Sequence, residues 1–266
     1  MTARLTGGSR SVADRVAIIT GAASGMGRAT AHLFSDEGAR VAICDRNAEA
    51  IERVGREIAD AHGDGMVLAL EVDVSDPTQL ERLVETTIER FGRLDIVVNN
   101  AGVAIPTPVD ASVSDDDFAR DWAITVDVNL SAYAHLIRHA ARHLRASDAP
   151  RIVNIASTEA IVATAGMSAY AASKAGVTGL TRSMAVELGR DGITVNCICP
   201  GPINTAMTVE IPDDAKDVYA RRRVPLRRYG EPEEVAHITL SICLPAASYL
   251  NGATIPVDGG MTIRHT

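Results

Sequence analysis

Residues 16–27 read VAIITGAASGMG, a short apolar run followed directly by a turn that contains three glycines. Gly21, Gly25 and Gly27 let the backbone bend sharply and approach a phosphate closely, because no side chain obstructs it. A helix that begins at this turn points its free N–H groups and its dipole at the negative charge. The stretch predicts a strand, a phosphate-binding turn and a helix. The spacing departs from the common G-x-G-x-x-G, so an ordinary tight turn is the alternative for this motif alone.

The same alternation of short apolar runs and longer amphipathic runs continues along the chain. Strands are predicted at residues 16–19, 41–44, 67–72, 94–98, 152–155, 193–198 and 254–257. Helices are predicted at residues 25–37, 48–62, 78–91, 117–144, 168–190 and 233–243. Gly38, Gly63 and Gly92 each follow one of these helices, where a residue without a Cβ is a favourable C-cap.

Most of the predicted strands are apolar throughout, which indicates that helices cover both faces of the sheet. We therefore expect an α/β fold with a single-domain, Rossmann-like, doubly wound sheet of about seven parallel strands. This domain is expected over residues 14–266, after a flexible extension at residues 1–13. The irregular segment 200–230 is either a mobile segment that lies over the functional site or an ordinary surface loop.

The bulk composition excludes several classes of protein. The 266 residues are 46% hydrophobic and 23% charged, which is ordinary for a globular domain. A formal net charge of −8 opposes binding to nucleic acid or to an anionic membrane surface. No apolar run has the length of a membrane span, and the start lacks an apolar signal core, so we expect a soluble cytoplasmic protein. The four scattered cysteines are expected as buried free thiols.

A metal site is not expected. His135, His139 and His143 share one helical face, but no carboxylate or cysteine accompanies them and several arginines do. A surface or subunit contact is therefore the preferred interpretation of these histidines. The arginines between residues 221 and 228 are interpreted as solvated charge, with an acyl-carrier partner or an anionic substrate as the alternative.

Asp45 ends the second predicted strand, 18 residues after Gly27. A carboxylate at this place accepts hydrogen bonds from an adenosine ribose and repels a 2′-phosphate. Arg46 could attract that phosphate, but the glycine turn itself carries no basic residue. The sequence therefore predicts NAD rather than NADP as cofactor. A solvated turn residue is the alternative interpretation of Asp45.

Further motifs follow the later strands. The chain has NNAG at residues 99–102, Ser157, and a Y-x-x-x-K formed by Tyr170 and Lys174. Together with Asp73-Val74, Pro200-Gly201 and VDGG at residues 257–260, they resemble the classical short-chain dehydrogenase/reductase family over nearly the whole chain. Ser157 precedes the tyrosine by 13 residues, as the family pattern expects.

The resemblance implies the residues of a site. The catalytic set would be Asn129, Ser157, Tyr170 and Lys174. The residues that would bind the cofactor are Gly21, Ser24, Gly25, Met26, Gly27, Asp45, Arg46, Asp73, Val74, Asn100, Ala101, Gly102, Tyr170, Lys174, Pro200, Gly201, Ile203 and Thr205. The resemblance also implies a homotetramer and a small alcohol or ketone as substrate, whose pocket we expect to include Ile105, Thr158, Ile161 and residues of the segment 200–230.

The chemistry explains why these residue types are needed. Alcohol oxidation needs a base for the hydroxyl proton, and a tyrosine with an ordinary pKa of about 10 is a poor base at neutral pH. Lys174 lies four residues after Tyr170 on the same helical face, where its ammonium, with a positive oxidised nicotinamide, favours the phenolate. Lowering the phenol pKa to about 7 needs roughly 4 kcal/mol. Ser157 would position the substrate oxygen, and by resemblance Asn129 would hold a water that links Lys174 to solvent.

We therefore expect an NAD-dependent oxidoreductase that interconverts a secondary alcohol and its ketone. An NADPH-dependent 3-oxoacyl-[acyl-carrier-protein] reductase is the nearest alternative, and Asp45 argues against it. A cofactor-sensing protein without catalysis is a third alternative, which the intact catalytic set disfavours.

Overall fold

Seven parallel strands form one sheet in the computed structural model, which describes residues 7–110 and 112–265 of the chain. The strands are β1 (Val16–Thr20), β2 (Arg40–Asp45), β3 (Val67–Glu71), β4 (Ile96–Asn99), β5 (Arg151–Ile155), β6 (Thr194–Pro200) and β7 (Thr254–Val257). Strands β1, β4, β5 and β6 are buried along their whole length, whereas the edge strands β3 and β7 are partly exposed. The predicted α/β fold is confirmed.

The strand order places a crevice at a defined point of the sheet. The order is β3-β2-β1-β4-β5-β6-β7, so the winding reverses between β1 and β4. In such sheets ligands bind outside the carboxyl ends of the strands, at the point of reversal. The glycine turn follows β1 and the NNAG loop follows β4, so the fold brings these two motifs to the same edge.

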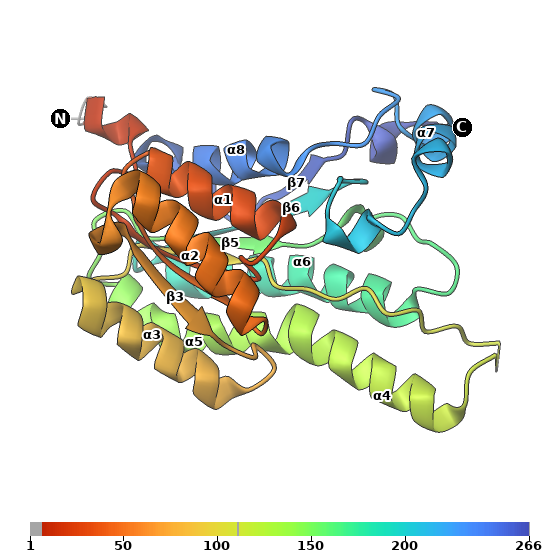
Figure 1. The fold of residues 1–266 in the computed structure, drawn as a ribbon, viewed down its shortest axis with the longest axis horizontal. Helices are drawn as coiled ribbons and strands as arrows, with labels where there is room; N and C mark the ends of the chain where they lie inside the picture. The colour runs from red at the N-terminus through yellow and green to blue at the C-terminus, as the bar shows by residue number, and fades with distance from the viewer. Residues whose placement is uncertain (1–6, 111, 266) are drawn as a thin grey trace.

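Helices cover both faces of the sheet (Figure 1). The long helices are α1 (Gly25–Asp36), α2 (Ala48–His62), α3 (Pro77–Phe91), α4 (Asp115–Val126), α5 (Ala132–Leu144), α6 (Ser168–Gly189), α7 (Asp213–Arg223) and α8 (Pro232–Cys243). The short turns of helix are η1 (Gly7–Arg10), η2 (Asp64–Met66), η3 (Asp127–Ser131), η4 (Thr158–Ala160), η5 (Ala206–Thr208), η6 (Pro245–Ala247) and η7 (Met261–Ile263). One apolar cluster packs α1, α2 and α8 on the sheet, and a second packs α3, α5 and α6 on the other face.

The helix predicted over residues 117–144 is interrupted. Helix α4 passes through η3, a π-helical turn, before α5 begins. A π turn adds one residue to a helical turn and is frequently found at functional sites. Asn129 lies in this turn and is fully buried. The apolar periodicity of the segment does not reveal the turn, because one extra residue shifts the buried face by only part of a turn.

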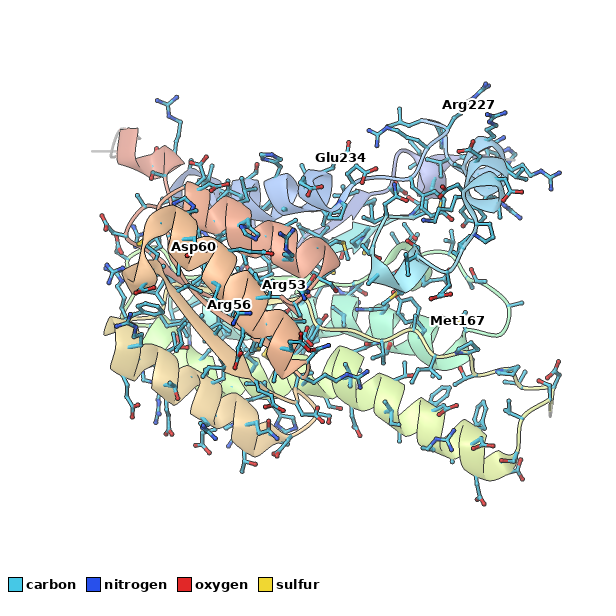
Figure 2. The ribbon with its side chains drawn as sticks, viewed as in Figure 1. Arg53, Arg56, Asp60, Met167, Arg227 and Glu234 are labelled. Atoms are coloured by element: carbon cyan, nitrogen blue, oxygen red, sulfur yellow. The ribbon has the colours of Figure 1, made fainter. Side chains whose placement is uncertain are left out.

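The segment 200–230 is more ordered than the sequence analysis expected. Its helix α7 has Asp213 and Asp214 in the first turn and three consecutive arginines in the last turn. Acidic residues near a helix N-terminus and basic residues near its C-terminus both stabilise the helix, because their charges interact favourably with the helix dipole. This charge distribution is visible in the sequence and could have predicted the helix. Arg227 extends from the loop that follows α7 (Figure 2).

Other expectations can be compared with the structure only in part. Residues 1–6 of the predicted flexible extension lie outside the described residues, while η1 forms a helical turn and Val12 is buried in the core. The four cysteines are free and buried, as predicted. Within the described residues, no helix could span a membrane and no group of three or more His, Cys, Asp or Glu side chains could hold a metal ion.

Candidate active site

The glycine turn after β1 has no room for side chains. Gly21 has a φ of +65°, in the left-handed region that favours glycine. A Cβ added at Gly27 would lie 2.2 Å from the carbonyl oxygen of Gly21 and 2.5 Å from Asn100 Nδ2. The first turn of α1 therefore packs directly against the loop before it, and its N-terminus faces the crevice.

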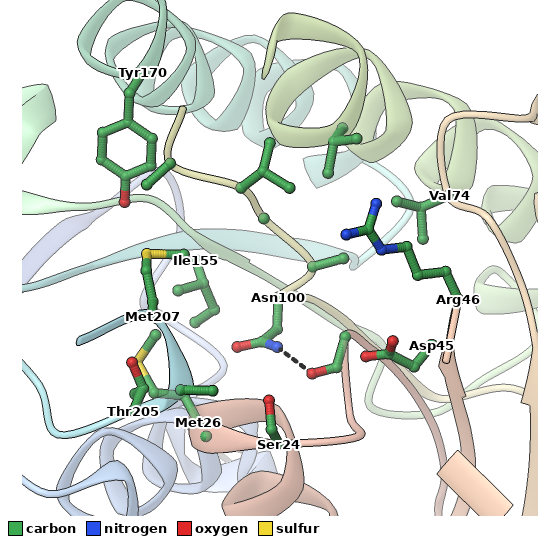
Figure 3. A pocket seen from close by; sticks show the side chains of 18 of the residues that line it. Ser24, Met26, Asp45, Arg46, Val74, Asn100, Ile155, Tyr170, Thr205 and Met207 are labelled. Atoms are coloured by element: carbon green, nitrogen blue, oxygen red, sulfur yellow. Dashed lines mark hydrogen bonds between the residues drawn. The ribbon is translucent and has the colours of Figure 1, made fainter. Parts of the chain in front are cut away.

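The NNAG loop after β4 is bound to this turn by hydrogen bonds (Figure 3). Asn100 Nδ2 donates to the carbonyl oxygens of Thr20, at 2.9 Å, and Gly21, at 3.1 Å. The hydroxyl of Thr20 accepts from the backbone N–H groups of Asn100 and Ala101, both at 3.0 Å. The two loops at the point of strand reversal thus form one rigid wall.

A cavity of about 600 Å³ lies against this wall and extends to Tyr170 and Lys174, whereas Ser157 and Asn129 of the predicted catalytic set are not among its lining residues. It is lined by most of the predicted cofactor-binding residues, namely Gly21, Ser24, Gly25, Met26, Asp45, Arg46, Asp73, Val74, Asn100, Ala101, Gly102, Tyr170, Lys174 and Thr205. In Figure 3, Asp45 and Arg46 lie at one end of the cavity and Tyr170 at the other. A cavity that runs from a strand-end carboxylate past a glycine turn to a tyrosine fits a dinucleotide.

Four predicted cofactor-binding residues do not line this cavity. Gly27 lies behind the turn, and Pro200 is buried at the end of β6. A Cβ added at Gly201 would lie 2.8 Å from Cα of Asp258, so Gly201 allows a close approach of two loops. Ile203 lines a second cavity, of about 350 Å³. These residues shape the site from behind, and any contact with cofactor stays a prediction.

The sequence analysis missed several apolar lining residues. They are Val72, Val103, Ala104, Ile124, Val128, Ile155 and Ala156, whereas Ala206 and Met207 belong to the segment 200–230, which was expected to contribute to the substrate pocket. Most directly flank the predicted motifs, and this adjacency is the signal that could have found them. Of the three residues predicted for the substrate pocket, Ile105 lines the cavity, whereas Thr158 and Ile161 do not.

Lys174 is a buried cation at the catalytic end of the cavity. Its residue is 3% exposed, and its ammonium donates to the carbonyl oxygen of Ile155 at 2.9 Å. Lys174 Nζ lies 5.8 Å from the centroid of the Tyr170 ring, so the two side chains lie together as the sequence predicted. Burial lowers the pKa of Lys174 from 10.5 to about 8, because desolvation disfavours the charged form.

Tyr170 and Ser157 form the other half of the catalytic end. Burial raises the pKa of Tyr170 above 10, and a hydrogen bond with Ser157 opposes this effect. Ser157 caps η4, where its hydroxyl accepts from the backbone N–H of Glu159 at 3.1 Å. In the protein without cofactor, the effect of burial on the pKa of Tyr170 is the larger one. Lys174 alone therefore does not lower this pKa toward 7, as was expected from the sequence.

Asn129 contacts the loop that lies in front of Lys174. Its Oδ1 accepts from the backbone N–H of Val103 at 2.8 Å, and its Nδ2 donates to the Val103 carbonyl and to Ser173. A Cβ added at Gly102 would lie 3.2 Å from Asn129 Oδ1 and 3.4 Å from Lys174 Nζ. Gly102 therefore separates the amide from the ammonium, and a side chain there would contact both.

Lys174→Met is expected to raise the free energy of unfolding by about 1–3 kcal/mol at pH 7, because it removes a desolvated ammonium. The folded-state pKa of about 8 lies below the ordinary 10.5. Below pH 8 both states are protonated and the full cost of burial opposes folding. Between pH 8 and 10.5 Lys174 loses its proton in the folded state but keeps it in the unfolded state. The cost of burying the charge therefore decreases with pH, and the stabilities of the wild type and the variant converge.

Denaturant unfolding of the cofactor-free proteins at pH 7 and pH 10 measures this difference. Lys216→Met is the matched control, because Lys216 is the other lysine of the sequence and is only partly buried. We expect little change in its stability at either pH. A Lys174→Met protein that is less stable than the wild type at pH 7 would contradict the argument.

Known proteins resemble this chain in both sequence and structure. A family model described as enoyl-(acyl carrier protein) reductase matches residues 21–262. The chain is 40% identical to cis-4-hydroxycyclohexanecarboxylate dehydrogenase of Sinomonas cyclohexanicum over 250 residues, which cover 94% of this chain and 97% of that protein. It is 37% identical to 3-oxoacyl-[acyl-carrier-protein] reductase FabG of Thermotoga maritima, over 94% of this chain and 98% of that protein.

The structural comparison agrees. A crystal structure of a dehydrogenase/reductase from Sinorhizobium meliloti 1021 matches with a TM-score of 0.87 and 36% identity, over 95% of this chain and 97% of that one. The residues that the family model matches, 21–262, include the glycine turn, the residues that line the cavity and the Tyr170–Lys174 pair. The chain belongs to the classical short-chain dehydrogenase/reductase family and is an oxidoreductase that acts on CH–OH groups with a nicotinamide cofactor.

Proposed function

We propose that the protein is an NAD-dependent dehydrogenase that interconverts a secondary alcohol and its ketone, with Tyr170 as general acid and base. One observation carries this proposal: a single cavity joins the glycine turn to Tyr170 and Lys174. A cofactor that is bound through its phosphates at the turn would therefore extend toward the two side chains that handle the proton.

The walls of the cavity support a small uncharged substrate. Apart from Lys174, the charged residues that line it are Asp45, Arg46 and Asp73, which lie at the end of β2 or shortly after β2 and β3. Met207 lies at the tyrosine end (Figure 3), and most other lining residues, such as Ile105, are apolar. Apolar walls favour an aliphatic or alicyclic alcohol over a carboxylate or a phosphate ester.

Each catalytic residue has a role that its contacts support. Tyr170 exchanges a proton with the substrate oxygen, and Ser157 holds that oxygen within reach while it hydrogen-bonds the phenol. When bound, the nicotinamide accepts or supplies the hydride, and its oxidised form adds positive charge. That charge and the Lys174 ammonium together favour the phenolate against the effect of burial. Asn129 keeps the Val103 loop in place in front of Lys174.

The choice of NAD rests on Asp45. Its Oδ1 accepts from the backbone N–H of Asn47 at 3.0 Å, and its Oδ2 faces the glycine turn, 3.4 Å from the backbone nitrogen of Ala23. The carboxylate is therefore held at the cavity edge, where it would accept hydrogen bonds from a ribose and repel a 2′-phosphate.

Asp45→Ala is expected to lower the ratio of NAD to NADP affinity by about 10- to 100-fold, through loss of ribose hydrogen bonds and of repulsion. Arg46 stays in place and can pair with a 2′-phosphate. Titration of each cofactor against the wild type and the variant measures the two dissociation constants.

Asp60→Ala is the control for loss of a negative charge, because Asp60 is exposed on α2 and outside the cavity (Figure 2). It should leave the affinity ratio unchanged. If the wild type binds NADP more tightly than NAD, the assignment of NAD is wrong.

An NADPH-dependent 3-oxoacyl-[acyl-carrier-protein] reductase is the second candidate. Arg46 in the cavity and the likeness to the Thermotoga maritima reductase favour it. A panel of secondary alcohols and ketones, assayed with both nicotinamides by the absorbance of the reduced cofactor, discriminates the two. Turnover of 3-oxoacyl thioesters with NADPH alone would replace our proposal. No turnover of any substrate would favour a cofactor-sensing protein.

We also propose a cytoplasmic homotetramer that binds neither nucleic acid nor membrane. The net charge of −8 supports the absence of polyanionic partners. Val186 on α6 is 84% exposed, and Trp122 and Ile124 on α4 are more than one-third exposed, so apolar side chains are available for subunit contacts. Sedimentation equilibrium of the purified protein determines the number of subunits.

A further inference from the structure

We propose that Tyr133, a residue outside the catalytic set, is a positioning residue that holds the ammonium of Lys174 against the face of its ring. The inference rests on the proposed role of Lys174 and goes beyond it, because it asks what keeps this cation in place. Lys174 Nζ lies 5.6 Å from the centroid of the Tyr133 ring, closer than the 5.8 Å to the Tyr170 ring.

The surroundings of Lys174 leave few other sources of negative potential. No ion pair joins it to a carboxylate anywhere in residues 7–110 and 112–265. Its one hydrogen bond in this part of the chain is to the Ile155 carbonyl. An ammonium over an aromatic face is attracted by the ring quadrupole, and the attraction is stronger where water is excluded. A cation that is 3% exposed therefore depends on the rings beside it.

The Tyr133 side chain is held in place both by its position on α5 and by the hydrogen bonds of its hydroxyl. It is 1% exposed on α5, and its hydroxyl donates to the carbonyl oxygens of Ala101, at 3.0 Å, and Ile155, at 3.1 Å. Ile155 thus accepts from both Tyr133 and Lys174, which its two lone pairs allow. The shared carbonyl shows that the ammonium and the hydroxyl end of the buried ring lie at the same place in the site.

Asn129 of the π turn and Tyr133 of α5 reach the site from one continuous helical segment. Tyr133 follows Asn129 by four residues, and both project into the site from the helix that runs through η3 into α5. Asn129 binds the backbone of Val103 while Tyr133 binds the carbonyl of Ala101. The helix therefore holds the NNAG loop at two points and supports Lys174 from the same face.

The titratable groups around Lys174 are Tyr170 on its own helix, Tyr133 on α5, and the thiols of Cys197 and Cys199 on β6. Burial raises the pKa of Tyr133 well above 10, so its hydroxyl stays protonated and acts as a constant donor. A hydrogen bond with Cys199 raises the pKa of Cys197, with burial adding to the effect. Tyr133 is therefore suited to hold the cation and unsuited to exchange protons with it.

The sequence offers a direct test, because Lys174 and Lys216 are its only lysines. Protein labelled with [ε-¹³C]lysine gives two side-chain signals, which Lys216→Arg assigns. A pH titration of the cofactor-free protein then reports the pKa of Lys174, about 8 in the wild type. We expect Tyr133→Leu to lower it by about 0.5 to 1 pH unit, through loss of the cation–π attraction. Tyr133→Phe retains the ring and should restore the wild-type value, while Lys216 titrates unchanged throughout.

Phe34→Leu is the matched control, since Phe34 is as buried as Tyr133 but packs on the opposite face of the sheet. It should lower stability without moving the Lys174 titration. An unchanged Lys174 pKa in folded Tyr133→Leu overturns the proposal. If that variant does not fold, Tyr133→trifluorophenylalanine is compared with Tyr133→Phe, because fluorination weakens the ring quadrupole at nearly constant shape. Equal Lys174 pKa values in these two proteins overturn it as well.

Activity gives a second readout. With cyclohexanol as probe, Tyr133→Leu should lower kcat about 3- to 10-fold and leave the KM for NAD within about twofold, and Tyr133→Phe should recover the loss. If the wild type turns over no secondary alcohol, the proposed function fails, while the lysine titration still decides the role of Tyr133.

Discussion

Tyr170→Phe is expected to lower kcat by about 100- to 10,000-fold while the dissociation constant for NAD stays within about threefold. The substitution removes the group that we propose exchanges a proton with the substrate oxygen, and general acid–base catalysis contributes effects of this size. It retains the ring that lines the cavity, so the cofactor site keeps its shape. The rate is followed by the absorbance of reduced cofactor, and the affinity by quenching of protein fluorescence.

Tyr219→Phe is the control for this substitution. Tyr219 lies on α7 and is 37% exposed, and among the described residues its hydroxyl makes one long contact, of 3.9 Å, to the sulfur of Met261. The same loss of a phenol hydroxyl should leave kcat near the wild-type value. A Tyr170→Phe protein with wild-type turnover would defeat the assignment of Tyr170 as acid and base.

Gly27→Ala is expected to weaken NAD binding by more than about 100-fold and to lower the free energy of unfolding by about 1–3 kcal/mol. The added methyl would lie 2.2 Å from the Gly21 carbonyl and 2.5 Å from Asn100 Nδ2. Either the turn or the NNAG loop must move, and both line the cavity. Isothermal titration with NAD and denaturant unfolding measure the two effects.

Gly65→Ala is a matched control for the removal of a glycine. Gly65 has nothing within 4 Å of an added Cβ and no positive φ, so the substitution is neither crowded nor strained. Its NAD affinity should equal that of the wild type. Tight NAD binding by Gly27→Ala would show that the turn does not need its close packing.

The prediction of the fold succeeded where local physics decides the structure. Apolar runs such as residues 152–155 became buried central strands, because only a sheet covered on both faces can hold them. Asn47 and Asp76 cap α2 and α3 with their side chains, which is a local interaction of adjacent residues. Prediction was weaker where charge rather than apolar periodicity stabilises an element, as in α7.

The prediction of the site succeeded for residues that carry their own chemistry at a fixed spacing. Tyr170 and Lys174 share a helical face by their four-residue separation alone. Tyr133 has no such spacing to either, and in the sequence it looks like an ordinary core residue of an amphipathic helix. Its contact with Lys174 depends on the packing of α5 and α6 against the same strands. Burial likewise makes the pKa of Tyr170 rise, and the four-residue spacing between Tyr170 and Lys174 carries no information about burial.

Local patterns along the chain were enough to predict the alternation of strands and helices, the glycine turn and the pairing of Tyr170 with Lys174. These features follow from periodicity, from missing side chains and from short separations along one element, all of which act between near neighbours in the chain. Tertiary packing alone sets the order of the strands and forms the cavity that joins the glycine turn to Tyr170. It also forms the π turn at Asn129 and the contact between the Lys174 ammonium and the Tyr133 ring. Contacts and desolvation between distant segments exist only after the sheet has formed, so no local pattern encodes them.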